Sequence, residues 1–315
     1  MRSLRKPTVD AVLRELDQLP TEQDNPDSAD LDSKSALEIA RTIHAGDQTV
    51  AGAVEPALPE IARGMDWIAE ALSRGGRLIY VGAGTSGRIA ALDALECPPT
   101  FDISPKLVEF IMAGGTAALV KAIEADEDSR TLGAREMRKK RPNQNDVVVG
   151  IAASGRTPFT VAAVEYAKSR GARTIAVSCN RETPLERAAD LAIVVQTGPE
   201  VVSGSTRMKA GTAQKMVLNM LSTGAMVRMG YVYGNLMVNL DQKNSKLTAR
   251  ALTIVQRALK IPRLDARRAL QAANHSVPAA IVMAKAGVSR REAEKVLKRS
   301  HGNVRQAIAL ALNMH

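Results

Sequence analysis

The sequence predicts an α/β fold built on a doubly wound parallel sheet, with N-terminal helices and a small all-helical C-terminal domain. Short apolar runs without polar alternation are typical of strands buried on both faces of such a sheet. Five such runs lie at 78–82, 107–113, 147–152, 174–179 and 191–195. Predicted helices separate them, including 85–96, 127–140 and 157–170. This alternation predicts parallel strands joined by right-handed crossovers.

Three of the predicted strands end in turns rich in glycine, serine and threonine. Their sequences are RLIYVGAGTSGR at 77–88, DVVVGIAASGRTP at 146–158 and AIVVQTGPEVVSGSTRMKAGTAQK at 192–215. A helix that follows such a turn offers unpaired N–H groups and the positive end of its dipole to an anion. Ligands of parallel sheets bind beyond the carboxyl ends of the strands, where these turns fall. We therefore expect a phosphorylated small molecule as ligand.

Helices are also predicted before the sheet. The capping-box spacing of Ser35 and Glu38 predicts the start of a short helix. A longer helix is predicted over 47–74, with Pro56 and Pro59 near its beginning or at a break.

We predict three regions along the chain. Residues 1–60 form an N-terminal arm and helices, 61–248 form the phosphate-binding α/β domain, and 249–315 form a small basic helical domain. The middle region contains a long helix at about 207–229. Prolines and glycines divide the last region into short helices at 264–273, 277–286, 289–298 and 303–313.

The net charge of +10 lies in the last region, because Ala249–His315 holds thirteen basic and three acidic residues. These basic residues follow helical spacing without interleaved aromatic residues. The pattern favours solvated helix faces, so we do not expect nucleic acid as a partner.

The composition is that of a soluble globular protein, with 45% hydrophobic and 24% charged residues. Cys97 and Cys179 are the only cysteines, which excludes a disulfide framework and fits a reducing compartment. No stretch approaches the roughly 18 uncharged apolar residues that cross a bilayer. We expect a cytoplasmic protein without a membrane partner.

The first glycine turn approximates a dinucleotide-binding motif through Gly82, Gly84 and Gly87. That motif also requires an acidic residue at the end of the next strand, but the strand LVEFIMAGG ends in small residues. The four histidines show no metal-ligand spacing. We therefore expect neither a nucleotide cofactor nor a metal.

The motifs GAGTSGR, ASGRTP and GSTRMKAGTAQK together resemble the sugar isomerase (SIS) domain. The run LIYVGAGTSGRIAALDALECPPTF, followed by IMAGG, EADEDSR and VVVGIAASGRTPF, is similar to the N-acetylmuramic acid 6-phosphate etherase family. The similarity covers most of the chain, from Thr21–Glu22 to VLNMLSTGAMVRMGYVYGNLMVN. The basic tail, with GVSRREAEKVL and HGNVRQAI, resembles the ubiquitin-associated (UBA)-like helical module at this family's C-terminus. The resemblance implies that the predicted sheet is SIS-type.

The resemblance implies a lyase that cleaves the D-lactyl ether bond of N-acetylmuramic acid 6-phosphate with water. The products are N-acetylglucosamine 6-phosphate and D-lactate, in cell-wall amino-sugar catabolism and recycling. In the open-chain sugar a base can remove the C2 proton next to the C1 aldehyde; the lactyl oxygen leaves C3 with a proton, and water adds back. Two protonatable groups are enough for this chemistry, without a metal.

The two catalytic glutamates of the family fall on Glu96 and Glu127. If Glu96 ends a helix beside Cys97 and two prolines, the dipole and the apolar surroundings raise its pKa, as a general acid requires. Glu127 lies before a predicted helix and suits a base. The residues alone also allow both to be plain surface carboxylates.

The resemblance assigns substrate and phosphate binding to the three turns. The residues are Gly84, Thr85, Ser86, Gly87, Ser154, Gly155, Arg156, Thr157, Ser203, Gly204, Ser205, Thr206 and Lys209. For Arg156 and Lys209, an ion pair with a neighbouring helix is the alternative role.

A helix running unbroken from Thr85 to Glu96 would separate the two by roughly 16 Å. One hexose phosphate cannot bridge that distance. We therefore predict a homodimer in which Glu96 serves a phosphate bound mainly by the second subunit, unless the chain folds back to shorten the distance.

Two other functions stay open. An aldose–ketose sugar-phosphate isomerase would use the same fold without an acid for a leaving group at C3. A non-catalytic sugar-phosphate sensor would need neither glutamate.

Overall fold

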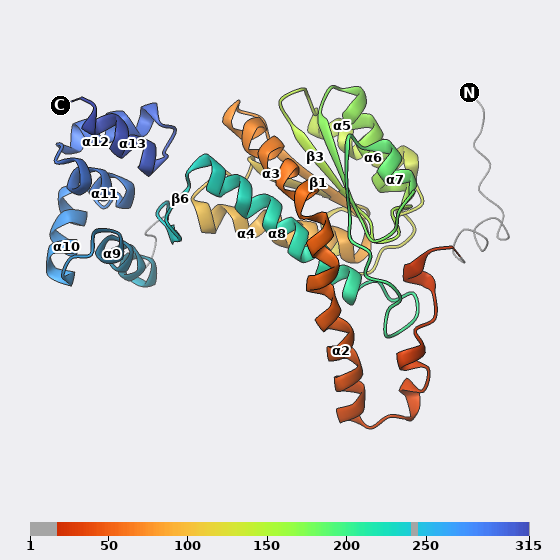
Figure 1. Cartoon of the computed structure of the whole chain (residues 1–315). Helices are drawn as coiled ribbons and strands as arrows, with labels where there is room; N and C mark the ends of the chain where they lie inside the picture. The colour runs from red at the N-terminus through yellow and green to blue at the C-terminus, as the bar shows by residue number, and fades with distance from the viewer. Residues whose placement is uncertain (1–17, 241–244, 315) are drawn as a thin grey trace. The chain divides into compact units, whose positions relative to one another are not determined.

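The computed structural model describes residues 18–240 and 245–314 of the chain (Figure 1). These residues form two compact units. The first contains the described residues up to Ala94 together with Val108–Leu221, and the second contains Leu95–Leu107 and the described residues from Ser222 onward. The three regions predicted above, with boundaries at 60 and 248, stay a prediction.

The first unit is built on a parallel sheet, which confirms the predicted fold class. Within the described residues its strands are β1 (Leu78–Gly82), β2 (Val108–Met112), β3 (Val147–Ile151), β4 (Arg173–Ser178) and β5 (Leu191–Val194). They pair in the order β2-β1-β3-β4-β5. All residues of β1 and β3 are buried, which explains why their sequences lack polar alternation. Each strand end lies within one residue of the predicted position.

Helices cover both faces of the sheet (Figure 1). Those of the sheet region are α3 (Leu58–Ser73), α4 (Gly84–Phe101), α5 (Arg130–Lys140), α6 (Pro158–Ser169), α7 (Pro184–Ala188) and α8 (Lys209–Met229). On one face, Met137 of α5 and Phe159 of α6 share a buried cluster with Ile79 of β1. On the other, α3 approaches α8 so closely that a Cβ on Gly64 would lie 2.7 Å from Leu221 Cδ2.

The N-terminal segments differ from the prediction in how far the first helix extends. Helix α2 runs from Ala36 to Val54 behind the predicted capping box, and the short 3₁₀ turn Glu55–Ala57 separates it from α3. Pro56 lacks the N–H that would continue α2, so the break falls at Pro56, one of the two roles predicted for the prolines. The difference from the prediction is that α2 continues through residue 47. Before α2 the arm contains the 3₁₀ turns Pro20–Glu22, Pro26–Ser28 and Leu31–Ser33. The predicted arm residues 1–17 lie outside the described residues.

Two helix ends in the sheet region were also predicted wrongly. Helix α4 continues past residue 96 to Phe101, because Asp102 N–H donates to the Pro98 carbonyl at 2.9 Å and closes a last turn after the prolines. Helix α5 begins at Arg130 rather than at 127, because the Ser129 hydroxyl caps it by accepting from Leu132 N–H. Glu127 therefore lies in the turn before α5.

The described residues of the second unit are mainly helical and include one short hairpin, β6 (Val232–Tyr233) and β7 (Leu236–Met237). Its helices among the described residues include α9 (Ser245–Leu259), α10 (Arg263–Ala272), α11 (Val277–Ala286), α12 (Arg290–Arg299) and α13 (Val304–Leu312). The last four begin and end within one residue of the predicted positions, whereas the hairpin and α9 were not predicted. Their buried side chains form one aliphatic cluster. No helix in the described part of the chain combines the length and apolarity of a membrane span.

Candidate functional site

The three predicted turns follow strands that end at one edge of the sheet. β1 and β3 are neighbours at the point where the strand order reverses. The first turn follows β1 and the second follows β3, so both lie where open parallel sheets bind ligands. The third turn follows β5 and leads into α8.

The first turn becomes helix α4 at Gly84, so the backbone N–H groups of its first residues have no partner within the helix. The turn is joined to α8 at two places. Ser86 Oγ donates to Gln214 Oε1 at 3.0 Å, in the interior. A Cβ on Gly211 would lie 3.6 Å from Thr85 Cγ2 and 3.6 Å from the Thr206 carbonyl oxygen. The first and third turns therefore meet.

The second turn is held by a glycine in the left-handed conformation. Gly155 has a φ of +68°, and a Cβ there would lie 2.5 Å from the side chain of Thr183, so only glycine fits. The hydroxyl of Ser154 accepts from Arg156 N–H at 3.3 Å. Thr157 precedes α6 but makes no side-chain cap, which leaves its hydroxyl outside the helix hydrogen bonds.

Positive charge gathers beside the second turn. Burial and the nearby guanidinium of Arg187 lower the pKa of Arg156. Two guanidinium groups that destabilise one another favour an anion between or near them. Ala153, just before this turn, packs with Cys179 and with Ala210 of α8. The second turn therefore packs against the start of α8, the helix that follows the third turn.

The third turn is more exposed than the first two. Ser203 and Gly204 are exposed, whereas Ser205 and Thr206 are partly buried. Ser203 Oγ donates to Asp24 of the N-terminal arm at 3.0 Å. The arm therefore contacts one of the three turns that were predicted to bind the ligand.

Lys209 begins α8 but its ammonium group bonds to the protein. Its Nζ donates to the Thr197 carbonyl at 2.8 Å, and the side chain is buried. The buried carboxylate of Glu200 accepts from the backbone N–H groups of Lys209 and Ala210, both at 2.9 Å. Glu200 thus caps α8, a position where a carboxylate is stabilised by the helix dipole.

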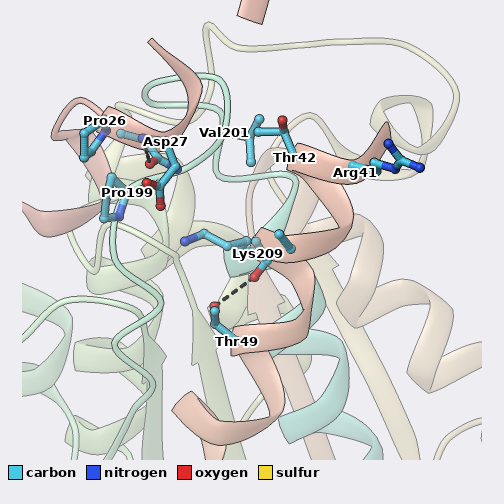
Figure 2. Close-up of a pocket in the computed structure, with 11 residues that line it drawn as sticks. Pro26, Asp27, Arg41, Thr42, Thr49, Pro199, Val201 and Lys209 are labelled. Atoms are coloured by element: carbon cyan, nitrogen blue, oxygen red, sulfur yellow. Dashed lines mark hydrogen bonds between the residues drawn. The ribbon is translucent and has the colours of Figure 1, made fainter. Parts of the chain in front are cut away.

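A cavity of about 550 Å³ lies beside the third turn (Figure 2). Its walls come from the arm, from α2 and from the start of α8. The lining residues include Asn25, Asp27, Arg41, Thr42, Val201 and Lys209. Figure 2 shows Arg41 extending away from the Lys209 side chain. The cavity shares Lys209 with the predicted binding residues and none of the residues predicted in the first two turns.

Glu127 lies at the first turn. A Cβ on Gly84 would lie 3.2 Å from Glu127 Oε1, which places the carboxylate against the start of α4. The Glu127 carbonyl accepts from Phe159 N–H of α6 at 3.0 Å, which fixes its backbone. The turn before α5 thus brings one of the two predicted catalytic residues to the predicted phosphate turn.

Burial raises the pKa of Glu127, and the neighbouring carboxylates Glu124 and Asp128 raise it further, whereas the charge of Arg88 lowers it. A carboxylate with a raised pKa holds an abstracted proton more tightly than an ordinary one. Glu127 therefore has the electrostatic surroundings of a general base.

Glu96 lies within α4 and on the surface, the second of the two alternatives that the sequence left open. The helix continues five residues beyond it to Phe101, so Glu96 does not face the end of the dipole. Its side chain is exposed, on the helix face that also exposes Leu92 (51%) and Leu95 (60%), while Cys97 is buried. Glu96 therefore lies neither at the end of the helix nor in a buried position.

Comparison with known proteins identifies the family. The family described as the glucokinase regulatory protein N-terminal SIS domain matches residues 60–168, and the SIS domain matches 133–224. The N-acetylmuramic acid 6-phosphate etherase of Photorhabdus laumondii is 49% identical over 93% of this chain and 98% of its own length. The chain belongs to the N-acetylmuramic acid 6-phosphate etherase family. Etherase 1 of Bacillus licheniformis is 45% identical over 94% of this chain and 97% of its own.

Solved structures show a more distant likeness to this etherase family member. A phosphoheptose isomerase from Neisseria gonorrhoeae is 18% identical, with a TM-score of 0.47 over 61% of this chain and 100% of that one.

Sequence reasoning missed three polar residues at the site of this etherase family member. Gln214 holds Ser86, Glu200 caps α8, and the carboxylate of Glu22 lies beside Gly204 of the third turn. Thr21–Glu22 was visible only as part of the family resemblance, since no periodicity or motif within the chain marks it.

The residues that the structure describes contain no group of three or more His, Cys, Asp or Glu side chains that could hold a metal ion. The expectation that the reaction needs neither metal nor cofactor stays a prediction.

Proposed function

We propose that the protein is a lyase that cleaves the D-lactyl ether of N-acetylmuramic acid 6-phosphate with water, giving N-acetylglucosamine 6-phosphate and D-lactate. The main support is the 49% identity to an etherase over 98% of that enzyme's length. The position of Glu127 at the first glycine turn supports it independently of the family, because a base is brought to an anion-binding turn.

The first two turns hold the 6-phosphate in this proposal. Thr85, Ser86 and Gly87 offer the start of α4, and Ser154, Gly155 and Thr157 offer the start of α6. Arg156 supplies positive charge. Residues 203–206 of the third turn close over the sugar, and Lys209 supports that turn through its bond to Thr197.

Glu127 acts as the base that removes the C2 proton from the open-chain sugar. The electron pair of the C2–H bond forms the C2–C3 double bond, and the C3–O bond breaks toward the lactyl oxygen. Glu96 protonates that oxygen as D-lactate departs. Water then adds to C3, and a proton returns to C2, so the atoms balance without a cofactor.

We propose that the active unit is a homodimer with shared sites. Helix α4 is continuous, and the eleven residues from Thr85 to Glu96 give a rise of roughly 16 Å. That distance supports a site in which Glu96 acts on a phosphate held by the partner subunit. The exposed Leu92 and Leu95 beside Glu96 give the partner an apolar surface to cover.

The cytoplasm is the proposed compartment, where the reaction would serve cell-wall amino-sugar recycling. Both cysteines are free and buried, which fits a reducing environment.

Turnover of N-acetylmuramic acid 6-phosphate in water enriched in ¹⁸O and deuterium tests the reaction. We expect release of D-lactate, ¹⁸O on C3 of the amino sugar and deuterium at C2. Interconversion of hexose phosphates without lactate would favour the isomerase alternative. Binding without any turnover would favour the sensor.

A further inference from the structure

The N-terminal arm carries a third carboxylate to the candidate site. A Cβ on Gly204 would lie 3.1 Å from Glu22 Oε2, so the carboxylate lies directly over the third turn. Gly204 itself has a φ of +74° and bears no side chain that could fill the space. Glu22 and Gly204 are 182 positions apart in sequence, so their contact depends on how the arm is attached.

Buried hydrogen bonds attach the arm to the edge of the sheet. Asn180, which follows β4, donates through its side-chain amide to Thr21 Oγ1 at 2.9 Å and to the Ala153 carbonyl at 3.1 Å. Both Thr21 and Asn180 are completely buried. Ala153 precedes the second turn, and Thr21 is the neighbour of Glu22. The Asn180 amide therefore connects the arm next to Glu22 with the second turn.

The arm is attached to the third turn as well. Asp24 accepts a hydrogen bond from Ser203 Oγ at 3.0 Å. Glu22 therefore has a fixed anchor on each side, at Thr21 and at Asp24, and its position over Gly204 is set by the fold.

Within the residues that the structure describes, the Glu22 carboxylate has no hydrogen-bond or ion-pair partner, although it is partly buried. Burial raises the pKa of Glu22, and no neighbouring charge offsets this. A partly buried carboxylate is stabilised when something pairs with it, and a ligand bound at the third turn would supply a donor.

The donor must be electrically neutral. A carboxylate repels the 6-phosphate and the lactyl carboxylate, since like charges a few Å apart are strongly unfavourable outside bulk water. Hydroxyl and amide N–H groups of the sugar are the donors that remain. The geometry points to Glu22 as a substrate-binding residue that accepts a hydrogen bond from an uncharged donor of the sugar body, while the first two turns hold the phosphate. This inference rests on the proposed sugar-phosphate substrate.

Isothermal titration of wild-type protein and Glu22→Gln with two ligands tests the assignment. N-acetylglucosamine 6-phosphate contains the sugar donors, whereas inorganic phosphate contains only the anion. We expect Glu22→Gln to bind the sugar phosphate about tenfold more weakly or worse, because a charge-assisted hydrogen bond becomes a weaker neutral one. Affinity for inorganic phosphate should stay within about twofold, since Glu22 does not touch the phosphate.

The exposed carboxylate of Asp32, on the same arm, provides the matched control. Asp32→Asn should bind both ligands like wild type, and thermal unfolding should show that both variants fold. An equal loss of affinity for both ligands would make Glu22 a structural residue. Unchanged affinity for both would remove it from the site. Either result overturns the inference.

The proposed function is tested separately by D-lactate release from the wild-type protein. If no lactate appears, the etherase proposal fails, but the two titrations still measure whether Glu22 selects the sugar body.

Discussion

The two ends of helix α4 differ in whether other residues of the same chain cover them. At the start, Gly84 lies against the Glu127 carboxylate and Ser86 bonds to Gln214 in the interior. In the later half, Leu92 and Leu95 are more than half exposed and Glu96 points outward. In the proposed site, a single chain therefore places the phosphate turn and the base at one end of the helix, and leaves Glu96 on an exposed face beside Leu92 and Leu95. The difference indicates that the proposed phosphate turn and Glu96 share one helix but depend on different surfaces, the first completed within the chain and the second left exposed.

Removing the proposed base, Glu127, beside the start of α4 should have the largest effect on activity. We expect Glu127→Gln to lower kcat by about 10²–10⁴-fold, the usual contribution of a general base. Lactate release under saturating substrate measures it. Glu124→Gln, a neighbouring exposed carboxylate, is the control and should lose less than tenfold. Comparable losses in the two variants would mean that the acidic cluster acts only through its overall charge.

A charge introduced on the exposed apolar face of α4 should disrupt the proposed dimer. Leu95→Asp places a carboxylate on the apolar face beside Glu96, so we expect sedimentation velocity to show monomers and activity to fall with the loss of dimer. Val120 is 92% exposed and lies beside Lys121, whose carbonyl accepts from Arg88 near the start of α4. It is not part of the face that exposes Leu92 and Leu95, so Val120→Asp should remain dimeric. A dimeric Leu95→Asp protein would place the interface elsewhere.

A glycine at the site can be compared with one in the helical unit. Gly155 and Gly287 share a φ of +68°, but a Cβ on Gly155 meets Thr183 at 2.5 Å and one on Gly287 meets nothing within 4 Å. Gly287→Ala should lower the free energy of unfolding by about 1 kcal/mol through backbone strain. Gly155→Ala should cost about 1–3 kcal/mol more, because the second turn is overpacked as well. Denaturant unfolding curves measure both, and equal costs would show that Thr183 moves aside freely.

The smallest expected effect is a pH dependence of stability. The pKa of Glu127 is raised above its ordinary value of 4.5, so the folded state disfavours its ionisation. Its contribution to stability is then fully present below that ordinary value and is lost as pH rises through the folded pKa. Relative to Glu127→Gln, the wild-type protein should lose stability between pH 4 and neutral pH. A gain over the same interval would mean that Arg88 outweighs burial.

The sheet and its turns could be predicted because their signals are local. A strand buried on both faces needs an unbroken apolar run, and β1 and β3 have one. The left-handed turn at residue 155 needs glycine. The helix boundaries that were predicted wrongly each depend on one hydrogen bond. The Ser129 hydroxyl caps the start of α5, and the bond from Asp102 N–H to the Pro98 carbonyl extends α4 past its prolines.

The composition of the site could be predicted only in part. Thr85, Ser86 and Ser154 lie in turns that a reader of the sequence can recognise. Glu22 and Gln214 reach the site through contacts that span more than 120 positions of the chain, and no local pattern records such contacts. The exposure of Glu96 was one of two predicted alternatives, and the sequence did not decide between them because the exposure depends on which face of α4 the fold leaves open.

The shared site is tested most directly by a mixed dimer. Glu96→Gln and Glu127→Gln chains with different affinity tags can be co-expressed and the heterodimer isolated by two successive purifications. Each parent dimer should be inactive. In the heterodimer one site combines the intact Glu127 of one chain with the intact Glu96 of the other, so we predict about half of the wild-type activity per dimer. A heterodimer of correct mass and normal unfolding temperature that releases no lactate would contradict the account.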